Sequence, residues 1–192
     1  MMNLEAVIER WRAGDQRAAE SIYNQHREKT FRLAYGLLGS TEDAEEAAQD
    51  ALAYALLHIH QFDDRKSQFT TWLYRITVSR SRDILRKRRV STYSLSSWLR
   101  EGHNPTDFRP GPEQRAEKKE NQNSVWDALQ ILSPDLREAI ILRHWSGCTY
   151  QEIAEITNCP MKTAQSRVRL AYQKLAHILE TVDFRQTAEE TR

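Results

Sequence analysis

A chain of 192 residues and 22.5 kDa has room for one ordinary domain or two small ones, which excludes a large multi-module enzyme. Its 28 basic and 27 acidic residues give a net charge of +1, which excludes a uniformly basic nucleic-acid-binding surface and an acidic disordered tail. The charges are nevertheless separated along the chain. Residues 1–64 hold six basic and 12 acidic side chains, whereas residues 65–89 hold nine basic and one acidic. We therefore expect two partners of different charge.

The chain carries no signal for export, membrane insertion or metal binding. No apolar run approaches the roughly 18 residues that cross a bilayer, and no secretory signal is visible, so we expect a cytoplasmic location without direct membrane insertion. Cys148 and Cys159 are too few for a disulfide framework or a four-thiolate zinc site. His58 and His60 are spaced i, i+2 and point to different helix faces. We expect no metal, no cofactor and no catalytic residue.

Six Gly, five Pro and few runs of alternating β-branched residues predict an all-α fold. Apolar residues at positions 4, 7, 8 and 11 predict a first short helix that ends at Gly14. A second helix is expected from a cap at Asp15 to Gly39, and a third from a cap at Thr41, with carboxylates in its first turn where the helix dipole favours them. A fourth helix is expected to start near Phe69 and to run into the four basic residues 86–89. These helices make up a first domain, residues 1–89.

A flexible linker is predicted over residues 90–123, because the sequence there loses its periodicity and gathers Ser, Gly and Pro. Periodicity returns in a second domain, residues 124–180, followed by a tail at residues 181–192. One helix of this domain begins with an N-cap at Ser133 and with Pro134 at the first helical position. The inward face of that helix is predicted to consist of Leu136, Ala139, Ile140 and Arg143.

The second domain contains the strongest motif of the chain. Thr149 and Glu152 have the spacing of a capping box, which predicts a helix from Tyr150. Asn158 tolerates the left-handed conformation of a tight turn, and Pro160 opens the next helix. Two short helices about such a turn predict a helix-turn-helix. The inward positions 164, 168, 171 and 175 leave six polar residues to solvent or DNA: Lys162, Thr163, Gln165, Ser166, Arg167 and Arg169.

The second helix of this motif suits the major groove of DNA. Residues 158–174 contain four basic residues and no acidic one, so phosphate would meet no like charge. Gln165 can read adenine, and arginines can read guanine or hold phosphates. The alternative is a helical hairpin whose basic face is only solvated.

Two sets of motifs, in the same order along the chain, resemble the extracytoplasmic-function (ECF) sigma factors of the sigma-70 family. In the second domain the resemblance lies in residues 128–134, 137–143, 149–154 and 162–167, and in the first domain in residues 38–46, 49–50 and 69–76. It covers about residues 5–89 and 124–179. The resemblance implies a sigma2-like helical bundle and a sigma4-like helix-turn-helix domain, joined by the linker.

The resemblance also implies which residues meet which partner. The third helix would bind the clamp of the largest polymerase subunit through Asp43, Glu46, Gln49 and Asp50. The loop after it would surround a flipped base of the minus-ten element with Asp63, Asp64, Arg65, Lys66, Ser67 and Gln68. The fourth helix would meet the single strand with Arg75, Ser79, Arg80, Arg82 and Arg86. The six polar residues of the recognition helix would read the minus-thirty-five element.

Some residues depart from the family pattern or fit a structural role better. Members often carry Asn at the position of Ser79, Gly at that of Lys162, and a basic residue at those of Gln165 and Leu170, which leaves the promoter sequence open. Leu170 is expected to pack and not to contact a base. Two aromatic residues on the apolar side of the fourth helix are interpreted as core residues and not as stacking platforms: Phe69 and Trp72.

The sequence thus predicts a non-enzymatic ECF-type sigma factor that directs core RNA polymerase to specific promoters and initiates transcription. The expected partners are core polymerase, through its clamp and flap, promoter DNA and an anti-sigma factor. The alternative is a stand-alone helix-turn-helix regulator, which would need a two-fold DNA site. An elongated monomer, or a run-off transcript made with core polymerase, would separate the two.

Overall fold

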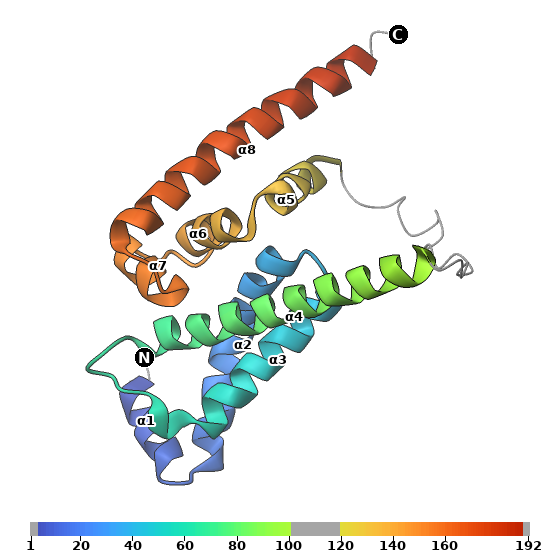
Figure 1. Cartoon of the computed structure of the whole chain (residues 1–192). Helices are drawn as coiled ribbons and strands as arrows, with labels where there is room; N and C mark the ends of the chain where they lie inside the picture. Colours follow the sequence, from blue (N-terminus) through green and yellow to red (C-terminus); the bar gives the residue numbers. More distant parts are fainter. Residues whose placement is uncertain (1–3, 101–119, 190–192) are drawn as a thin grey trace.

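The computed structural model describes residues 4–100 and 120–189, with side chains for residues 4–88 and 125–179. Within these ranges the chain consists of helices and turns and contains no strand, so the all-α prediction is confirmed. The first group of helices is α1 (Leu4–Arg12), α2 (Gln16–Leu38), α3 (Thr41–Leu57) and α4 (Phe69–Arg100), with a 3-10 turn, η1 (Ile59–Gln61), after α3. The second group is α5 (Glu120–Ile131), α6 (Pro134–His144), α7 (Tyr150–Thr157) and α8 (Met161–Glu189). The second group lies along α2 and α4 (Figure 1).

Local chemistry explains the boundaries of the first group. The Asp15 carboxylate accepts a first-turn backbone N–H at 3.0 Å, and Gly39 ends α2 in the left-handed conformation, at φ +69°. The expected cap of α3 at Thr41 is wrong by one residue. Ser40 is the N-cap, because its hydroxyl accepts the backbone N–H of Asp43 at 3.4 Å.

The helix-turn-helix has the predicted caps. Thr149 accepts the backbone N–H of Glu152 at 3.2 Å, and the Glu152 carboxylate accepts that of Thr149 at 2.7 Å, which completes the capping box. Asn158 adopts the left-handed conformation, at φ +53°, and ends α7. The turn between α7 and α8 is therefore fixed by backbone chemistry that is readable in the sequence.

The segment predicted as a linker is helical at both of its ends. α4 continues to Arg100, and α5 begins at Glu120, so only residues 101–119 of the predicted linker lie outside the described residues. No Gly or Pro occurs between positions 90 and 101, and nothing in that stretch forces α4 to end. Similarly, α8 extends to Glu189 and includes most of the predicted tail.

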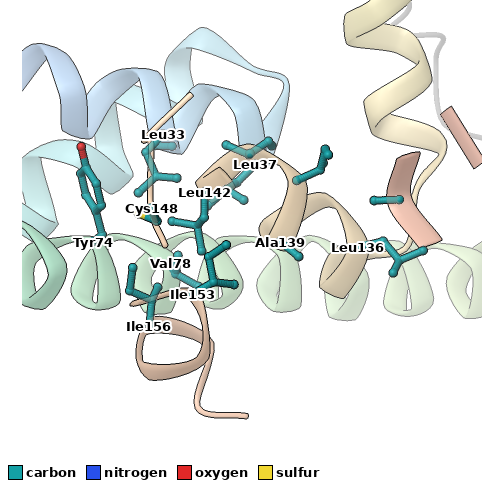
Figure 2. Packing of buried hydrophobic residues seen from close by; sticks show 14 of the residues in the cluster. Leu33, Leu37, Tyr74, Val78, Leu136, Ala139, Leu142, Cys148, Ile153 and Ile156 are labelled. Carbon is teal, nitrogen blue, oxygen red and sulfur yellow. The ribbon is translucent and has the colours of Figure 1, made fainter. Parts of the chain in front are cut away.

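Two buried apolar clusters hold the helices together. The first joins α1 to the start of α2, the end of α3 and the start of α4. It includes Phe69 at 3% and Trp72 at 6% exposure, as predicted for core residues. The second contains side chains of both helical groups. Figure 2 shows Leu33, Leu37, Tyr74 and Val78 of the first group against side chains of the second: Leu136, Ala139, Leu142, Cys148, Ile153 and Ile156. The two groups therefore share one core.

A buried guanidinium connects the groups within this shared core. Arg137 of α6 is 8% exposed and donates to the carbonyls of Leu129 at 2.9 Å, in the last turn of α5, and of Leu132 at 3.1 Å, directly after α5. It also donates to the Leu37 carbonyl of α2 at 2.8 Å. One side chain thus satisfies backbone acceptors on both sides of the interface.

Two side-chain contacts add to this link. Arg82 of α4 forms a double hydrogen bond with the buried Glu138 carboxylate of α6, at 2.7 and 2.5 Å. Thr71 of α4 donates to Glu152 of α7 at 3.2 Å. The interface is therefore apolar at its centre and polar toward α4.

Two predicted core positions are wrong. Arg143 is exposed, because its guanidinium reaches past the end of α6 to the Cys148 carbonyl at 3.0 Å. Leu170 is 43% exposed. It follows the buried Val168 by two residues, or about 200° around the helix, and so points away from the core.

His26 of α2 is a buried polar side chain without a hydrogen-bond partner. It is 4% exposed, and its ring packs edge-on against that of Phe69, with the ring centroids 5.1 Å apart. Burial, with a smaller effect of Lys29, lowers the pKa of His26 from 6.5 to about 4. The folded chain therefore holds this imidazole neutral.

This pKa predicts an acid-dependent loss of stability. Below pH 6.5 the unfolded chain binds a proton at His26 and the folded chain does not, so the free energy of unfolding decreases as pH falls toward 4. By pH 4.5 the decrease from this group is on the order of 2 kcal/mol. Denaturant unfolding of the wild type, His26→Leu and His26→Phe at pH 7.5 and 4.5 should show a smaller decrease in both variants. Equal decreases in all three proteins would contradict this.

Gly36 of α2 allows the close approach of α6. A Cβ at this position would meet Ile141 Cδ1 at 3.0 Å and Cγ2 at 3.1 Å. We expect Gly36→Leu to separate the two helices, because the shared core has no room for the side chain.

The separation can be measured as a larger radius of gyration by small-angle X-ray scattering, with a stability loss of about 1 to 3 kcal/mol. Ile141→Ala creates space opposite Gly36, so the double variant should regain part of the compactness and show non-additive stability. An unchanged radius in Gly36→Leu, together with additive effects, would show that this contact does not hold the groups together.

Candidate nucleic-acid and polymerase interfaces

The recognition helix α8 presents most of its predicted DNA-binding residues to solvent. Ala164, Val168 and Ala171 are fully buried, as the inward face requires. Thr163 is half-buried, and the Arg167 guanidinium pairs with Asp135 of α6 at 2.5 Å. The other four predicted residues are exposed along one side of the helix: Lys162, Gln165, Ser166 and Arg169.

The loop between η1 and α4 holds the residues predicted to surround a flipped base. Asp63 accepts the backbone N–H and the guanidinium of Arg65, both at 3.1 Å, and the Lys66 ammonium lies 3.5 Å away. The hydrogen bond from Arg65 lowers the pKa of Asp63, so this carboxylate is ionised at neutral pH. Asp64 and Gln68 are exposed, and Ser67 is half-buried.

The outer face of α4 brings three of the predicted single-strand contacts together. Arg75, Ser79 and Arg80 line a cavity of about 300 Å³ whose other walls include Tyr54 and Trp72. The Arg80 guanidinium lies 5.0 Å from the centroid of the Tyr54 ring. This site therefore combines positive charge with aromatic surface.

The other two predicted single-strand contacts of α4 lie outside this cavity. Arg82 points toward α6 and is bound to Glu138, and Arg86 is exposed and pairs with Asp83 at 2.8 Å. Sequence reasoning missed Tyr54, whose ring stacks on that of His58 with centroids 4.0 Å apart. The i, i+4 spacing of these two rings was the available signal, because it places them on one side of α3.

The predicted polymerase-binding residues lie along α3. Glu46, Gln49 and Asp50 are exposed, whereas Asp43 forms an ion pair with Arg88 of α4. Gln49 also lines a groove of about 380 Å³ between α2 and α3, together with Tyr23, Arg27, Glu28, Phe31, Glu45, Ala48 and Leu52. The acidic surface of α3 is thus continuous with a groove that has aromatic walls.

The described residues form no recognisable metal-binding site. They contain no group of three His, Cys, Asp or Glu side chains that could hold one. Burial raises the pKa of Cys148 to about 12, so this thiol stays protonated at neutral pH. Within residues 4–100 and 120–189, no helix has an apolar stretch long enough to span a bilayer.

Comparison with known proteins identifies both halves of the chain. Residues 22–90 match the family model for sigma-70 region 2, and residues 122–175 match the model for sigma-70 region 4. The ECF RNA polymerase sigma-E factor of Escherichia coli (strain K12) is 30% identical over 174 residues, which cover 85% of this chain and 87% of that protein. The ECF RNA polymerase sigma factor SigW of Bacillus subtilis (strain 168) is 28% identical over 180 residues, or 91% of this chain and 95% of that protein.

A solved structure shares the arrangement of the helices. It contains the sigma factor RpoE in complex with the anti-sigma factor NepR from Bartonella quintana, and the alignment has 26% identity and a TM-score of 0.66 over 84% of this chain and 96% of that chain. These relatives are sigma factors, and the resemblance drawn from the sequence is confirmed. The chain belongs to the ECF sigma factor family, the sigma-70-type subunits that direct RNA polymerase to promoters.

Proposed function

We propose that this ECF sigma factor acts in the cytoplasm, catalyses no bond chemistry itself, and guides core polymerase to promoters that have two separate elements. α8 reads the upstream, minus-thirty-five element, while the loop at residues 63–68 and the outer face of α4 open and read the minus-ten element. The observation that carries this proposal is that each helical group exposes a surface with basic residues, Lys162 and Arg169 on α8 and Arg75 and Arg80 on α4.

The chemistry of α8 supports the upstream role. The N-terminal part of a recognition helix contacts base edges in the major groove. Here that part presents Gln165, an amide suited to adenine, next to Lys162 and Arg169, which are suited to phosphate or guanine.

The cavity on α4 supports the downstream role. Extruding a base costs a few kcal/mol, which stacking and charge must offset. The cavity supplies both, because Tyr54 provides aromatic surface while Arg75 and Arg80 provide charge. Ser79 adds a hydroxyl that can hydrogen-bond to a base or to the backbone.

The surface of α3 supports binding to polymerase. Glu46, Gln49 and Asp50 are exposed beside the groove between α2 and α3, so they can meet a basic surface of the clamp. The second helical group would bind the flap. Each reading surface alone would bind DNA weakly, and polymerase raises the effective concentration of both.

The two helical groups must separate when both elements are read. Elements centred about 25 base pairs apart lie about 85 Å apart on B-DNA, at 3.4 Å per base pair. Thr71 of α4 contacts Glu152, and α8 begins nine residues after Glu152, which limits the distance from Thr71 to the start of α8 to about 45 Å. The compact arrangement therefore cannot reach both elements at once.

A separate anti-sigma factor, like the one bound to the Bartonella quintana relative, would keep the chain from polymerase.

Transcription from fragmented genomic DNA with purified core polymerase, followed by sequencing of transcript ends, tests this function. We expect transcripts only when chain and core are both present, with two common sequence elements at a fixed spacing upstream of each start. The chain alone should show negligible specific binding to the same duplexes. Specific binding without core, to two-fold sites and unaffected by added core, would instead support a stand-alone regulator.

The same assay assigns the reading surfaces. Gln165→Ala should weaken selection at one position of the upstream element by about tenfold and leave the downstream element unchanged. Arg75→Ala should have the converse effect. Gln173→Ala is the matched control for Gln165, because Gln173 is also an exposed glutamine of α8 but lies about two turns farther from the end that enters the groove.

A further inference from the structure

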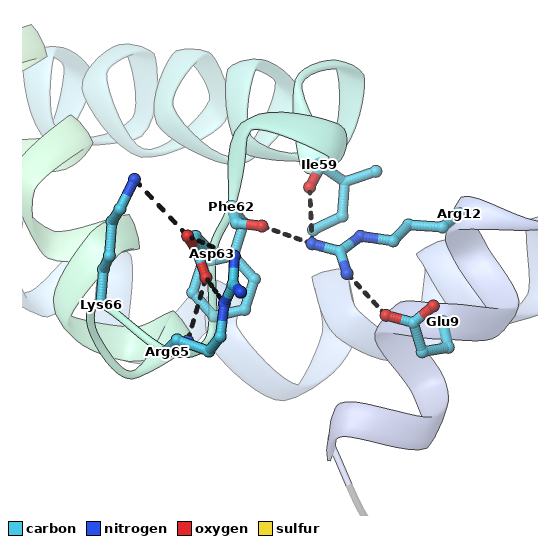
Figure 3. A network of polar contacts seen from close by, with 7 residues as sticks. All are labelled: Glu9, Arg12, Ile59, Phe62, Asp63, Arg65 and Lys66. Carbon is cyan, nitrogen blue, oxygen red and sulfur yellow. Dashed lines mark hydrogen bonds and ion pairs between the residues drawn. The ribbon is translucent and has the colours of Figure 1, made fainter.

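The first helix has a position that its sequence did not reveal. α1 lies before residue 22, where the match to the sigma-70 region 2 model begins. It packs against η1, at the base of the loop that holds residues 63–68 (Figure 3). A helix outside the matched segment therefore borders the predicted minus-ten reading loop.

Two side chains at the end of α1 bind backbone carbonyls that precede the loop. The Trp11 indole N–H donates to the Leu56 carbonyl at 2.9 Å, in the last turn of α3. The Arg12 guanidinium donates to the Ile59 carbonyl at 3.4 Å and to the Phe62 carbonyl. Carbonyls at a helix end lack partners within the helix, so Trp11 supplies a donor to the last turn of α3.

Neighbouring residues hold Arg12 in position to bind these carbonyls. Its other terminal nitrogen donates to Glu9 at 2.6 Å, and its side chain is 28% exposed, compared with 57% for Arg10 of the same helix. The planar guanidinium binds the carbonyls with one terminal nitrogen and Glu9 with the other, which a lysine ammonium cannot do with the same geometry.

Phe62 links these contacts to the loop. Its ring is buried, with the centroid 5.4 Å from that of Phe69 and 5.5 Å from that of Trp72. Its carbonyl is the one that Arg12 binds, and Asp63 follows directly. The loop thus starts from a residue whose ring is fixed by α4 and whose backbone is fixed by α1.

An open cavity of about 940 Å³ lies between α1 and the loop. Glu9, Trp11 and Arg12 form one wall, and the loop residues 63–66 form another. The volume is within the range of small-ligand sites and exceeds that of the cavity on α4. If α1 moved, both the loop and the shape of this cavity would change.

We propose that α1 is part of the minus-ten reading unit, and that Trp11 and Arg12 are positioning residues that fix the start of the loop without contacting DNA. This inference rests on the proposed function, because it assigns α1 to the surface that reads the downstream element. Its consequence is that discrimination among downstream bases depends on a helix that touches none of them.

The test uses the full chain with core polymerase and a promoter found by the transcription assay. Arg12→Lys keeps the charge and loses the planar fork, and Trp11→Phe keeps the ring and loses the N–H. Both should retain wild-type affinity for core. Both should lower the preference for the matched over a mismatched minus-ten base by about tenfold, measured as promoter opening with 2-aminopurine fluorescence, and should leave preference in the upstream element unchanged.

The salt dependence of DNA affinity distinguishes a positioning residue from one that contacts DNA directly. A residue that binds phosphate contributes about one unit to the slope of log affinity against log salt concentration. Arg12→Gln removes the charge, and on our proposal it leaves this slope unchanged while it lowers base preference as Arg12→Lys does. Arg10→Gln is the matched control on the same helix and should change neither quantity.

Each outcome decides the proposal. A shallower salt slope in Arg12→Gln with unchanged base preference would assign Arg12 to DNA and overturn it. Wild-type preference in both Arg12→Lys and Trp11→Phe would also overturn it, while the wild-type chain still opened promoters and the proposed function stood. If Arg12→Gln fails to fold, by thermal unfolding, Trp11→Phe still decides the outcome.

Discussion

The buried apolar core between the two helical groups is the feature on which the rest of the structure depends. α2, α3 and α4 contribute one side, α5 to α8 the other, and Arg137 donates to carbonyls of both. Because the side chains of this core are buried and its Arg137 and Glu138 are hydrogen-bonded, the compact chain is a defined state and not a chance contact between tethered units. It also places Arg82, which the sequence assigns to DNA, in a double hydrogen bond with Glu138.

This arrangement gives the core two roles that compete. In the free chain it covers apolar surface on both groups and stabilises each of them. On the proposed two-element promoter the groups would lie farther apart than the compact form allows. Polymerase and DNA would then together supply the free energy needed to separate the interface. The separation of charge along the chain fits this exchange, because the acidic α3 and the basic α4 are proposed to meet different partners.

Most of the fold is readable from the sequence, because it depends on local chemistry. The capping box at Thr149, the left-handed Asn158 and the buried Phe69 and Trp72 follow from spacing alone. What sequence reasoning missed depends on contacts between distant residues. Nothing local indicates that Arg82 binds Glu138 or that α1 contacts the carbonyls before the loop. The spacing of Tyr54 and His58 places both rings on one side of α3, but it does not indicate the cavity with α4. The extension of α4 to Arg100 was missed for another reason, since a serine-rich stretch lacks the apolar periodicity that indicates a helix.

The distance between the two helical groups, in the free chain and on a promoter, tests the central claim most directly. Labels can be placed at Glu20 of α2 and Gln173 of α8, which are both exposed, after Cys159 is replaced by serine; Cys148 is buried. We predict efficient energy transfer between the labels in the free chain, and its loss when core polymerase and promoter DNA are added together. Unchanged transfer in a complex that still produces transcripts would show that the compact chain reads promoters without opening, and would contradict the account.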